Sequence, residues 1–422
     1  MKSACCLLIC VGAGALVDAA DWPQWRGPLR DGVSQESGLL VEWPKEGPKL
    51  LWQVADIGNG YATPTVVGRR LFLLSNRGME NEFVQALSIE DGKQLWSTRF
   101  GNVGNPDQSP SYPMARSTPT VDGDRLYALS SDGDLACLET ATGKALWRKN
   151  LKSDFGGKPG KWAYSESPLI DGDALIVTPG GAGSTLVALN KNTGAVVWKS
   201  AVPGGDAAAY SSAIVAEAAG RKQYIQFLDK GLVGVDAKTG RFLWRYEKTS
   251  GGPANIATPI AHNGYVYSAN SRRFGGGLVQ LHATGDGVSA EEVYFERDAP
   301  NTLGGQVLVD GYLYGTNPRG MVCMEFVSGK IQWQSPGVGP GAVQYVGGRL
   351  YVHGENGDVA LVEATPEAYR EKGRFTPPAQ PKHVSGGGSR DEHAWAYPVA
   401  AGGRLYIRDL GTLWCYDIKP KR

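Results

Sequence analysis

The sequence predicts an all-β fold: an eight-bladed β-propeller of four-stranded antiparallel blades, with the ring closed by an N-terminal outer strand. Three observations lead to it. A tryptophan recurs roughly every 40 to 50 residues, a glycine turn recurs in each unit, and one strand-like segment near the N-terminus has no partner of its own. Composition agrees, because 58 Gly, 12 Trp and 18 Tyr in 422 residues are typical of many short strands joined by tight turns.

The first observation is the spacing of the tryptophans. The recurring positions are Trp52, Trp96, Trp147, Trp198, Trp244 and Trp333. The first five are 44, 51, 51 and 46 residues apart, and the last follows after 89, which is about two further units. A repeated large aromatic residue belongs to the core, so we expect Trp147 to be wedged between adjacent blades. Trp147→Ala is then expected to cost roughly 3–5 kcal/mol.

The clearest unit runs from Ser117 to Trp147. Its predicted strands are Ser117–Val121, Leu126–Leu129, Leu135–Leu138 and Ala145–Trp147. Turn residues separate them, because Asp, Asn and Gly tolerate positive φ in tight hairpins. Four antiparallel strands of this length make one propeller blade.

Eight copies of the first hairpin can be counted. Their turns lie at or around Gly68, Gly123, Gly172, Gly220, Gly264, Gly311, Gly348 and Gly403. In blade five the tryptophan position falls near Tyr294-Phe295, and blade seven ends near Phe375. The last copy ends after Tyr416 without a fourth strand, whereas Leu50–Val54 precedes the first copy without a partner. Pairing the two closes the ring and removes two open edges.

The N-terminus predicts export. Lys2 is followed by an uncharged stretch, Ala4–Val17, and by small residues up to Ala19, which is the pattern of a cleaved signal peptide. We therefore expect residues 1–19 to be a signal peptide and residues 20–422 to form a single propeller domain in the periplasm or outside the cell. Lipidation at Cys10 is the alternative. No later segment reaches transmembrane length.

Net charge, cysteine usage and histidine spacing argue against nucleic-acid binding, a disulfide framework and a metal site. With 43 basic and 42 acidic residues and no long run of one sign, nucleic-acid binding has no support. Cys137, Cys323 and Cys415 occupy one register of the repeat, which indicates a small buried slot and no disulfide framework. None of the five histidines has a metal-binding partner at a motif spacing, so we predict no metal site.

Units such as Ala141–Trp147 (ATGKALW) resemble the tryptophan-docking repeats of PQQ-like β-propellers. The opening Asp21–Pro28 and the later Val362–Pro366 resemble a secreted subgroup of that family. The resemblance implies the fold but leaves function divided. The family contains quinoprotein alcohol dehydrogenases and also a non-enzymatic lipoprotein of the outer-membrane β-barrel assembly machinery.

The resemblance also bears on cofactors. In the quinoprotein dehydrogenases, PQQ and calcium lie in the channel and a disulfide of adjacent cysteines packs against PQQ. The only adjacent pair here, Cys5-Cys6, lies in the expected signal peptide, and no haem-attachment motif is present. The leading hypothesis is therefore a binding or scaffolding module without a cofactor. The alternative is a PQQ-dependent oxidoreductase acting on an alcohol or sugar. No catalytic residue can be assigned.

The expected working face follows from the loops. The hairpin turns within blades are tight, whereas the loops between strands two and three and between blades are longer and emerge on the opposite face. Insertions collected on one face of a repeat protein usually form its binding surface. Candidate ligand-binding residues, at the entries of the first strands on this face, are Asn59, Tyr61, Arg116, Tyr164, Glu166, Tyr210, Asn255, Asn301 and Trp395. They suit an unknown small polar ligand or a protein partner. Alternatively they plug the channel, with Arg116 and Glu166 as an ion pair.

Overall fold

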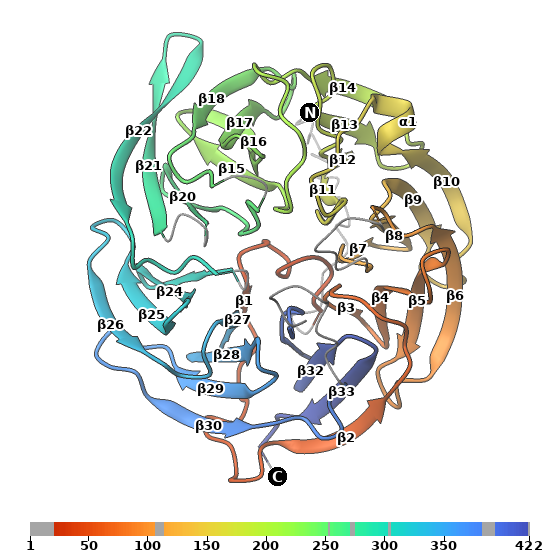
Figure 1. Cartoon of the computed structure of the whole chain (residues 1–422), viewed down its shortest axis with the longest axis vertical. Coiled ribbons are helices and arrows are strands. Elements are labelled where there is room, and N and C mark those ends of the chain that lie inside the picture. Colours follow the sequence, from red (N-terminus) through yellow and green to blue (C-terminus); the bar gives the residue numbers. More distant parts are fainter. Residues whose placement is uncertain are drawn as a thin grey trace, which may run out of the picture.

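The computed structural model describes residues 21–105, 114–251, 254–270, 275–302, 305–381 and 393–420. Eight antiparallel sheets surround a central axis, which confirms the predicted eight-bladed propeller (Figure 1). The expected signal peptide and Cys10 lie outside the described residues.

Each blade follows the chain from an inner strand near the axis to an outer strand at the rim. Blades 1 to 4 consist of β3 (Thr65–Val67), β4 (Arg70–Asn76), β5 (Glu82–Ser88) and β6 (Gln94–Gly101); β7 (Thr120–Asp122), β8 (Arg125–Leu129), β9 (Asp134–Glu139) and β10 (Ala145–Asn150); β11 (Leu169–Asp171), β12 (Ala174–Val177), β13 (Leu186–Asn190) and β14 (Val196–Ser200); and β15 (Ile214–Ala218), β16 (Arg221–Phe227), β17 (Leu232–Asp236) and β18 (Phe242–Tyr246).

Blades 5 to 7 repeat this order, and blade 8 takes its outer strand from the N-terminal part of the chain. They consist of β19 (Ile260–His262), β20 (Tyr265–Asn270), β21 (Gly275–Thr284) and β22 (Gly287–Glu296); β23 (Val307–Val309), β24 (Tyr312–Asn317), β25 (Gly320–Glu325) and β26 (Ile331–Ser335); β27 (Gly341–Val346), β28 (Arg349–Gly354), β29 (Val359–Glu363) and β30 (Glu371–Phe375); and β31 (Val399–Ala401), β32 (Arg404–Asp409), β33 (Thr412–Asp417) and β2 (Lys49–Val54). A short parallel strand, β1 (Val33–Ser34), joins the inner edge of β27.

The first hairpin of every blade has a two-residue turn, with the predicted glycine first in blades 1 to 3 and second in blades 4 to 8. All eight predicted turn glycines have positive φ, between 55° at Gly68 and 82° at Gly264, Gly311 and Gly348. Only glycine adopts this conformation without steric cost. These turns lie on one face, the tight-turn face. The described parts of the connections between blades lie on the opposite face, the long-loop face. The longest connections, counted in residues, separate β6 from β7, β10 from β11 and β30 from β31.

The ring closes as the sequence predicts. β2 pairs antiparallel with β33, with Leu50 opposite Tyr416 and Val54 opposite Leu413. Arg408 on β32 adds a second link between blades 8 and 1. Its guanidinium is fully buried and donates to the carbonyl oxygens of Ala62 and Leu74 at 2.8 Å, and to Gly58 at 3.2 Å.

Docked tryptophans link most neighbouring blades. The indole N–H of each donates to a backbone carbonyl beside the outer turn of the next blade, as Trp96 does to Thr140 at 3.0 Å and Trp147 to Lys191 at 3.0 Å. The residue opposite the tryptophan in the neighbouring strand must be small, and Cys137 faces Trp147 there with no exposed surface. Cys323 and Cys415 have the same position opposite Trp333 and Trp52. The structure confirms the small buried slot.

Trp244 departs from this pattern. Its N–H donates to Gln223 Oε1 in its own blade at 2.6 Å. The reason lies in blade 5, where β21 and β22 form a hairpin of ten-residue strands in place of the usual five-residue outer turn. This hairpin packs beside β18, and Lys248 pairs with Glu292 at 2.5 Å.

Blade 7 receives its tryptophan from elsewhere in the chain. Gly373 occupies the docking register of β30, opposite Leu361, and Trp43 from the N-terminal segment packs directly over it. Trp43 lies 5.8 Å from the Tyr351 ring, close to the 6.2–6.3 Å of the Trp333–Tyr314 and Trp147–Tyr127 pairs. The segment before β2 therefore completes the repeat that β30 lacks.

Candidate functional site

A short segment leads into each first strand from the long-loop face, close to the axis (Figure 1). A Ser/Thr-Pro pair marks several of these entries, at Thr63-Pro64, Thr118-Pro119, Ser167-Pro168 and Thr258-Pro259. Side chains alternate in direction along an extended segment, so positions two residues apart share a face. Tyr61, Arg116, Ser165, Tyr210 and Trp395 occupy the same position of this register.

Hydroxyl groups join these entry segments around the axis. Backbone N–H groups donate to hydroxyls of the following blade, from Tyr397 to Thr63 at 3.1 Å, from Thr118 to Ser167 at 2.9 Å and from Ser167 to Ser212 at 2.9 Å. Buried polar groups need such partners. The entries are therefore fixed relative to one another.

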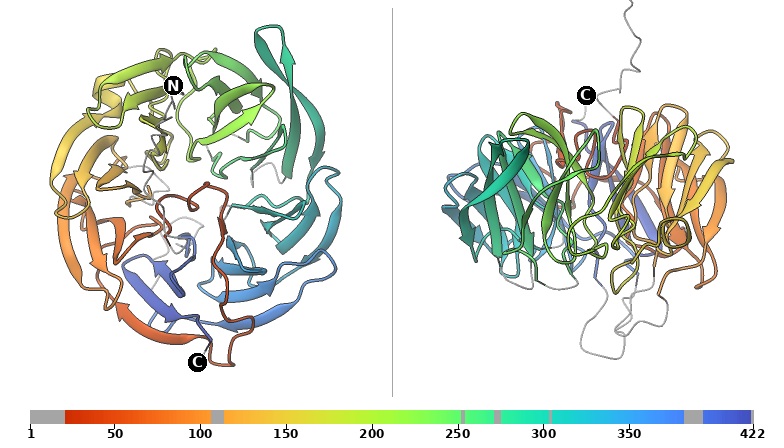
Figure 2. Two further views of the ribbon diagram at one scale, coloured as in Figure 1. Left: turned by 180° about the vertical axis from the view of Figure 1, so that it is seen from behind. Right: turned by 90° about the horizontal axis from the view of Figure 1, so that it is seen from above.

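The N-terminal plug, residues 21–32, crosses the axis. It lies toward the tight-turn face, where Asp21 accepts from Gly68 of the first turn at 2.9 Å. Trp22 pairs with Val66 of β3, and the Trp25 indole donates to Thr258 of the blade 5 entry at 2.8 Å. From the axis the chain continues past β27 and reaches the rim before β2 (Figures 1 and 2).

Two buried arginines anchor the plug. Arg26 donates to the carbonyl of Gln306 in blade 6, and Arg30 donates to Ser167 at 2.7 Å and Pro168 at 2.9 Å in blade 3. Trp25 packs against Tyr397 of blade 8 with ring centroids 4.4 Å apart. The plug therefore contacts blades on all sides of the axis and fills the channel toward the tight-turn face.

Four of the predicted residues lie together at the mouth of the channel on the long-loop face. Tyr61 and Trp395 pack with ring centroids 4.8 Å apart, and the Arg116 guanidinium lies 5.5 Å from the Tyr61 ring centre. Arg116 is also within electrostatic reach of the Tyr210 hydroxyl. Met114 and Leu410 join Tyr61 in a small apolar cluster.

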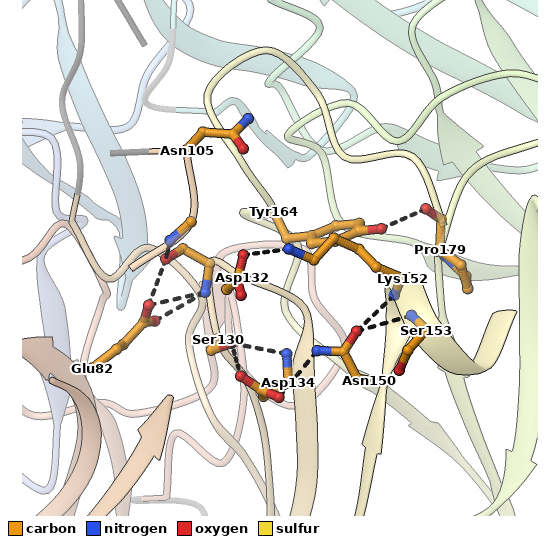
Figure 3. Close-up of polar contacts among 12 residues, drawn as sticks. Glu82, Asn105, Ser130, Asp132, Asp134, Asn150, Lys152, Ser153, Tyr164 and Pro179 are labelled. Carbon is orange, nitrogen blue, oxygen red and sulfur yellow. Dashed lines mark hydrogen bonds and ion pairs between the residues drawn. The ribbon is translucent and has the colours of Figure 1, made fainter. Parts of the chain in front are cut away.

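Three other candidates have structural contacts instead. Tyr164 is 1% exposed, lies in the core between blades 2 and 3, and donates to the carbonyl of Pro179 at 2.8 Å (Figure 3). Asn255 is fully buried and donates to Leu228 O at 2.6 Å. Glu166 accepts from Thr178 N–H and Gln226. The positive charge that acts on Glu166 comes from Arg30 of the plug, not from Arg116 as the ion-pair alternative supposed.

Asn59 and Asn301 occupy equivalent positions of the register, two residues before Tyr61 and Leu303. The Asn59 side chain is exposed, and its backbone pairs with Asn76. Asn301 is 2% exposed and its N–H donates to Thr316 O at 2.9 Å. Within the described part of the chain its carboxamide has no hydrogen-bond partner.

Sequence reasoning missed the carboxyl group of Glu82, beneath the mouth. Glu82 is fully buried and accepts from the Ser131 N–H at 3.0 Å and from the Ser131 hydroxyl (Figure 3). The Ser131 hydroxyl accepts in turn from Gly104 N–H at 2.9 Å. The sequence shows an acidic residue at the start of a strand, as at Asp134 in the next blade. It does not show that the Ser131 turn of the neighbouring blade covers it.

Burial raises the pKa of Glu82 to about 8, and Arg116 lowers it less than burial raises it. A carboxyl whose folded-state pKa lies above its unfolded value of 4.5 stabilises the fold at low pH, and this contribution is lost as the pH rises from about 5 to 8. The free energy of unfolding of the wild type should fall by on the order of 4 kcal/mol through this carboxyl between these pH values. Glu82→Gln should not show this fall. Urea unfolding at both pH values measures the difference. Glu90→Gln, an exposed control, should keep the wild-type slope, and an equal slope in Glu82→Gln would contradict the assignment.

The described residues include no group of three or more His, Cys, Asp or Glu side chains that could hold a metal ion. They also include no helix of sufficient length and apolar character to cross a membrane.

Solved structures with the same fold have diverse roles. A BamB structure from Moraxella catarrhalis covers 88% of this chain and 98% of its own, with a TM-score of 0.60 and 14% identity. A quinohemoprotein alcohol dehydrogenase from Comamonas testosteroni covers 97% of this chain and 82% of its own, with a TM-score of 0.53 and 14% identity. Likeness at this identity shows the fold alone.

Curated relatives match by sequence over part of their length. Tetrathionate hydrolase of Acidithiobacillus ferrooxidans is 27% identical over 258 residues, which is 53% of this chain and 48% of the relative. Outer membrane protein assembly factor BamB of Xanthomonas campestris is 27% identical over 202 residues, 47% of this chain and 44% of the relative. The chain thus spans about half the length of the curated relatives it matches.

A family model matches most of the chain. The model described as outer membrane protein assembly factor BamB aligns with residues 32–108 and 81–335, which include blades 1 to 6 and part of the N-terminal segment. The chain therefore belongs to this family of PQQ-like propellers.

Proposed function

We propose that the protein is an exported binding or scaffolding module of the periplasm or cell envelope, and that it holds a polar ligand or a peptide segment of a partner at the long-loop face. The observation that carries the proposal is the cluster of Tyr61, Arg116, Tyr210 and Trp395 at the channel mouth. Aromatic surfaces with a few placed polar groups are typical of binding sites.

The asymmetry of the two faces supports this location. The tight-turn face has two-residue turns in all eight blades, and the plug fills the channel on that side. The described parts of the longest connections between blades, such as residues 114–119, 151–168 and 393–398, lead to the opposite mouth. Loops held by a rigid scaffold are the usual carriers of binding function.

The family supports the class of function. Its matching relatives include several proteins named outer membrane protein assembly factor BamB, and we propose that this chain likewise acts on other proteins of the envelope. A relative named tetrathionate hydrolase and neighbours named alcohol dehydrogenases leave enzymatic functions as the competing class.

The channel chemistry favours binding over PQQ-dependent oxidation. Calcium prefers several carboxylate and amide oxygens. Glu166, a carboxyl group near the axis, is already bonded to Thr178 and Gln226, and the described residues include no donor cluster for a metal. These residues do not fit a calcium-bound quinone.

Calorimetric titration of the purified protein with PQQ and calcium tests the proposal. We expect no heat of binding, no shifted PQQ absorbance and no dye reduction with common alcohols. Binding of PQQ at micromolar concentration would overturn the binding-module proposal and favour the oxidoreductase.

A further inference from the structure

Aromatic and cationic side chains alternate across the long-loop mouth. They come from the blade 2–3 connection and from the entries of blades 4, 2, 1 and 8. The basic aromatic stripe consists, in spatial order, of Lys161, Trp162, Tyr210, Arg116, Tyr61 and Trp395. The sequence does not reveal this order, because the six residues come from entries and connections that lie far apart in the chain.

Lys161, Trp162 and Tyr210 form one group of direct contacts in the stripe, and Arg116, Tyr61 and Trp395 form a second group, with Arg116 within electrostatic reach of Tyr210. The Lys161 ammonium lies 5.4 Å from the Trp162 ring centre, and the Trp162 and Tyr210 rings are 5.7 Å apart. The backbone N–H of Trp162 also donates to the Tyr210 hydroxyl at 2.9 Å. Cations over aromatic faces are attracted by the ring quadrupole, so these contacts restrict the side chains before any partner arrives.

The stripe combines accessibility with a positive charge. Lys161 is exposed and Arg116, Trp162 and Trp395 are half-buried. The stripe contains two cationic residues and no acidic residue. A carboxyl group that acts on Arg116, that of Glu82, is fully buried and held by Ser131. An approaching partner therefore meets the two cationic groups and not this carboxyl.

This composition is that of a protein-interaction hot spot. Trp, Tyr and Arg are enriched at such centres, because rigid aromatic rings bury a large area at low entropic cost. Arg binds carboxylates through two parallel hydrogen bonds. The half-buried rings of Trp162 and Trp395 leave apolar surface for nonpolar side chains of a partner next to the charge. A protein segment offers both features together, which favours it over an acidic polysaccharide.

We propose that the basic aromatic stripe binds an acidic, aromatic-containing peptide segment of a partner protein, with a carboxylate at Arg116 and a second near Lys161. This proposal rests on the proposed function, because it names the partner chemistry for the same face.

Three fluorescein-labelled peptides of equal length test the proposal. They differ only in carrying Glu, Gln or Lys between the same Phe and Gly residues. Fluorescence anisotropy with the full purified chain should show the Glu peptide binding about tenfold more tightly than the Gln peptide, with the Lys peptide weakest. Raising ionic strength from about 0.05 M to about 0.3 M should weaken the Glu peptide most, because screening acts on exposed charges.

Two substitutions locate the binding. Arg116→Gln should weaken the Glu peptide about tenfold, which corresponds to about 1.4 kcal/mol. Lys161→Gln, at an exposed position where folding is not affected, should weaken it about threefold. Lys238→Gln on the tight-turn face removes the same charge from the opposite face and should bind like the wild type.

Equal affinity for the three peptides, or wild-type affinity in both stripe variants, would overturn the proposal. Tighter binding of an oligogalacturonate than of the Glu peptide would assign the stripe to acidic saccharides instead. Neither result would overturn the proposed function, which requires only that the long-loop face contacts a partner in cells. The proposed function fails on a different result, the binding of PQQ.

Discussion

Replacement of Arg408 by Met is expected to destabilise the protein by roughly 3–5 kcal/mol, because it leaves buried acceptors without a donor. The guanidinium donates to Ala62, Leu74 and Gly58 in blade 1 and has no exposed surface. Its pKa is lowered to about 9 by burial, yet the carbonyl dipoles around it make the site dependent on a cation. Urea unfolding monitored by tryptophan fluorescence measures the loss.

Arg404 provides the matched control. It lies on the same strand, β32, and also joins blade 8 to blade 1, through Glu90 at 2.6 Å near the surface. Arg404→Met should cost about 1 kcal/mol or less, because ion pairs near the surface contribute little and the Ile89 carbonyl, its other acceptor, keeps the Trp52 indole as a donor. Equal losses of unfolding free energy in the two variants would show that burial does not strengthen the link that Arg408 makes between blades 8 and 1.

Trp43→Ala should cost roughly 3–5 kcal/mol, the range for a large aromatic side chain removed from a core. Trp43 is 5% exposed and packs against Tyr351 and Phe375, so its loss leaves a cavity between blades 7 and 8. Trp147→Ala should fall at the lower end of that range, because Trp147 is only half-buried at the rim. The order of the two unfolding midpoints is the measured result.

Val41→Ala is the control for the N-terminal segment. Val41 lies two residues before Trp43 and is 61% exposed, so its truncation should change stability by less than about 0.5 kcal/mol. A midpoint for Trp43→Ala equal to that of Val41→Ala would show that the segment does not complete blade 7.

The sequence predicts the repeat well because each repeated residue has a local physical cause. Gly123 is needed for positive φ, Cys137 is small because Trp147 lies opposite, and the orphan strand Leu50–Val54 has to pair. Blade count and ring closure follow from these positions alone. The ten-residue strands of blade 5 and the inward turn of Trp244 do not, because both depend on contacts between blades.

Segments outside the repeat are less predictable. Neither the plug nor Trp43 has a periodic position, so the sequence indicates neither that Arg26 and Arg30 bond to carbonyls around the axis nor that Trp43 covers Gly373. Two features of the sequence could have indicated this contact. Blade 7 has no tryptophan in its outer strand, and Trp43, shortly before β2, belongs to no repeat unit.

The candidate site shows the same limit. Tyr61, Arg116, Tyr210 and Trp395 come together because they share one position of the entry register. Tyr164 and Asn255 lie one position away, and alternation along the extended segment turns them into the core between blades. A register alignment of the eight entries would have separated these two groups. The burial of Glu82 under Ser131 requires the neighbouring blade.

Site-specific photo-crosslinking in intact cells tests most directly whether the long-loop face is the working face. A photoreactive residue replaces Lys161 on that face or Lys238 on the tight-turn face; both side chains are exposed and neither belongs to the core. Adducts are identified by mass spectrometry. The account predicts a defined partner from position 161, lost in the Arg116→Gln background, and none from position 238. A partner captured from position 238 and not from 161 would contradict it.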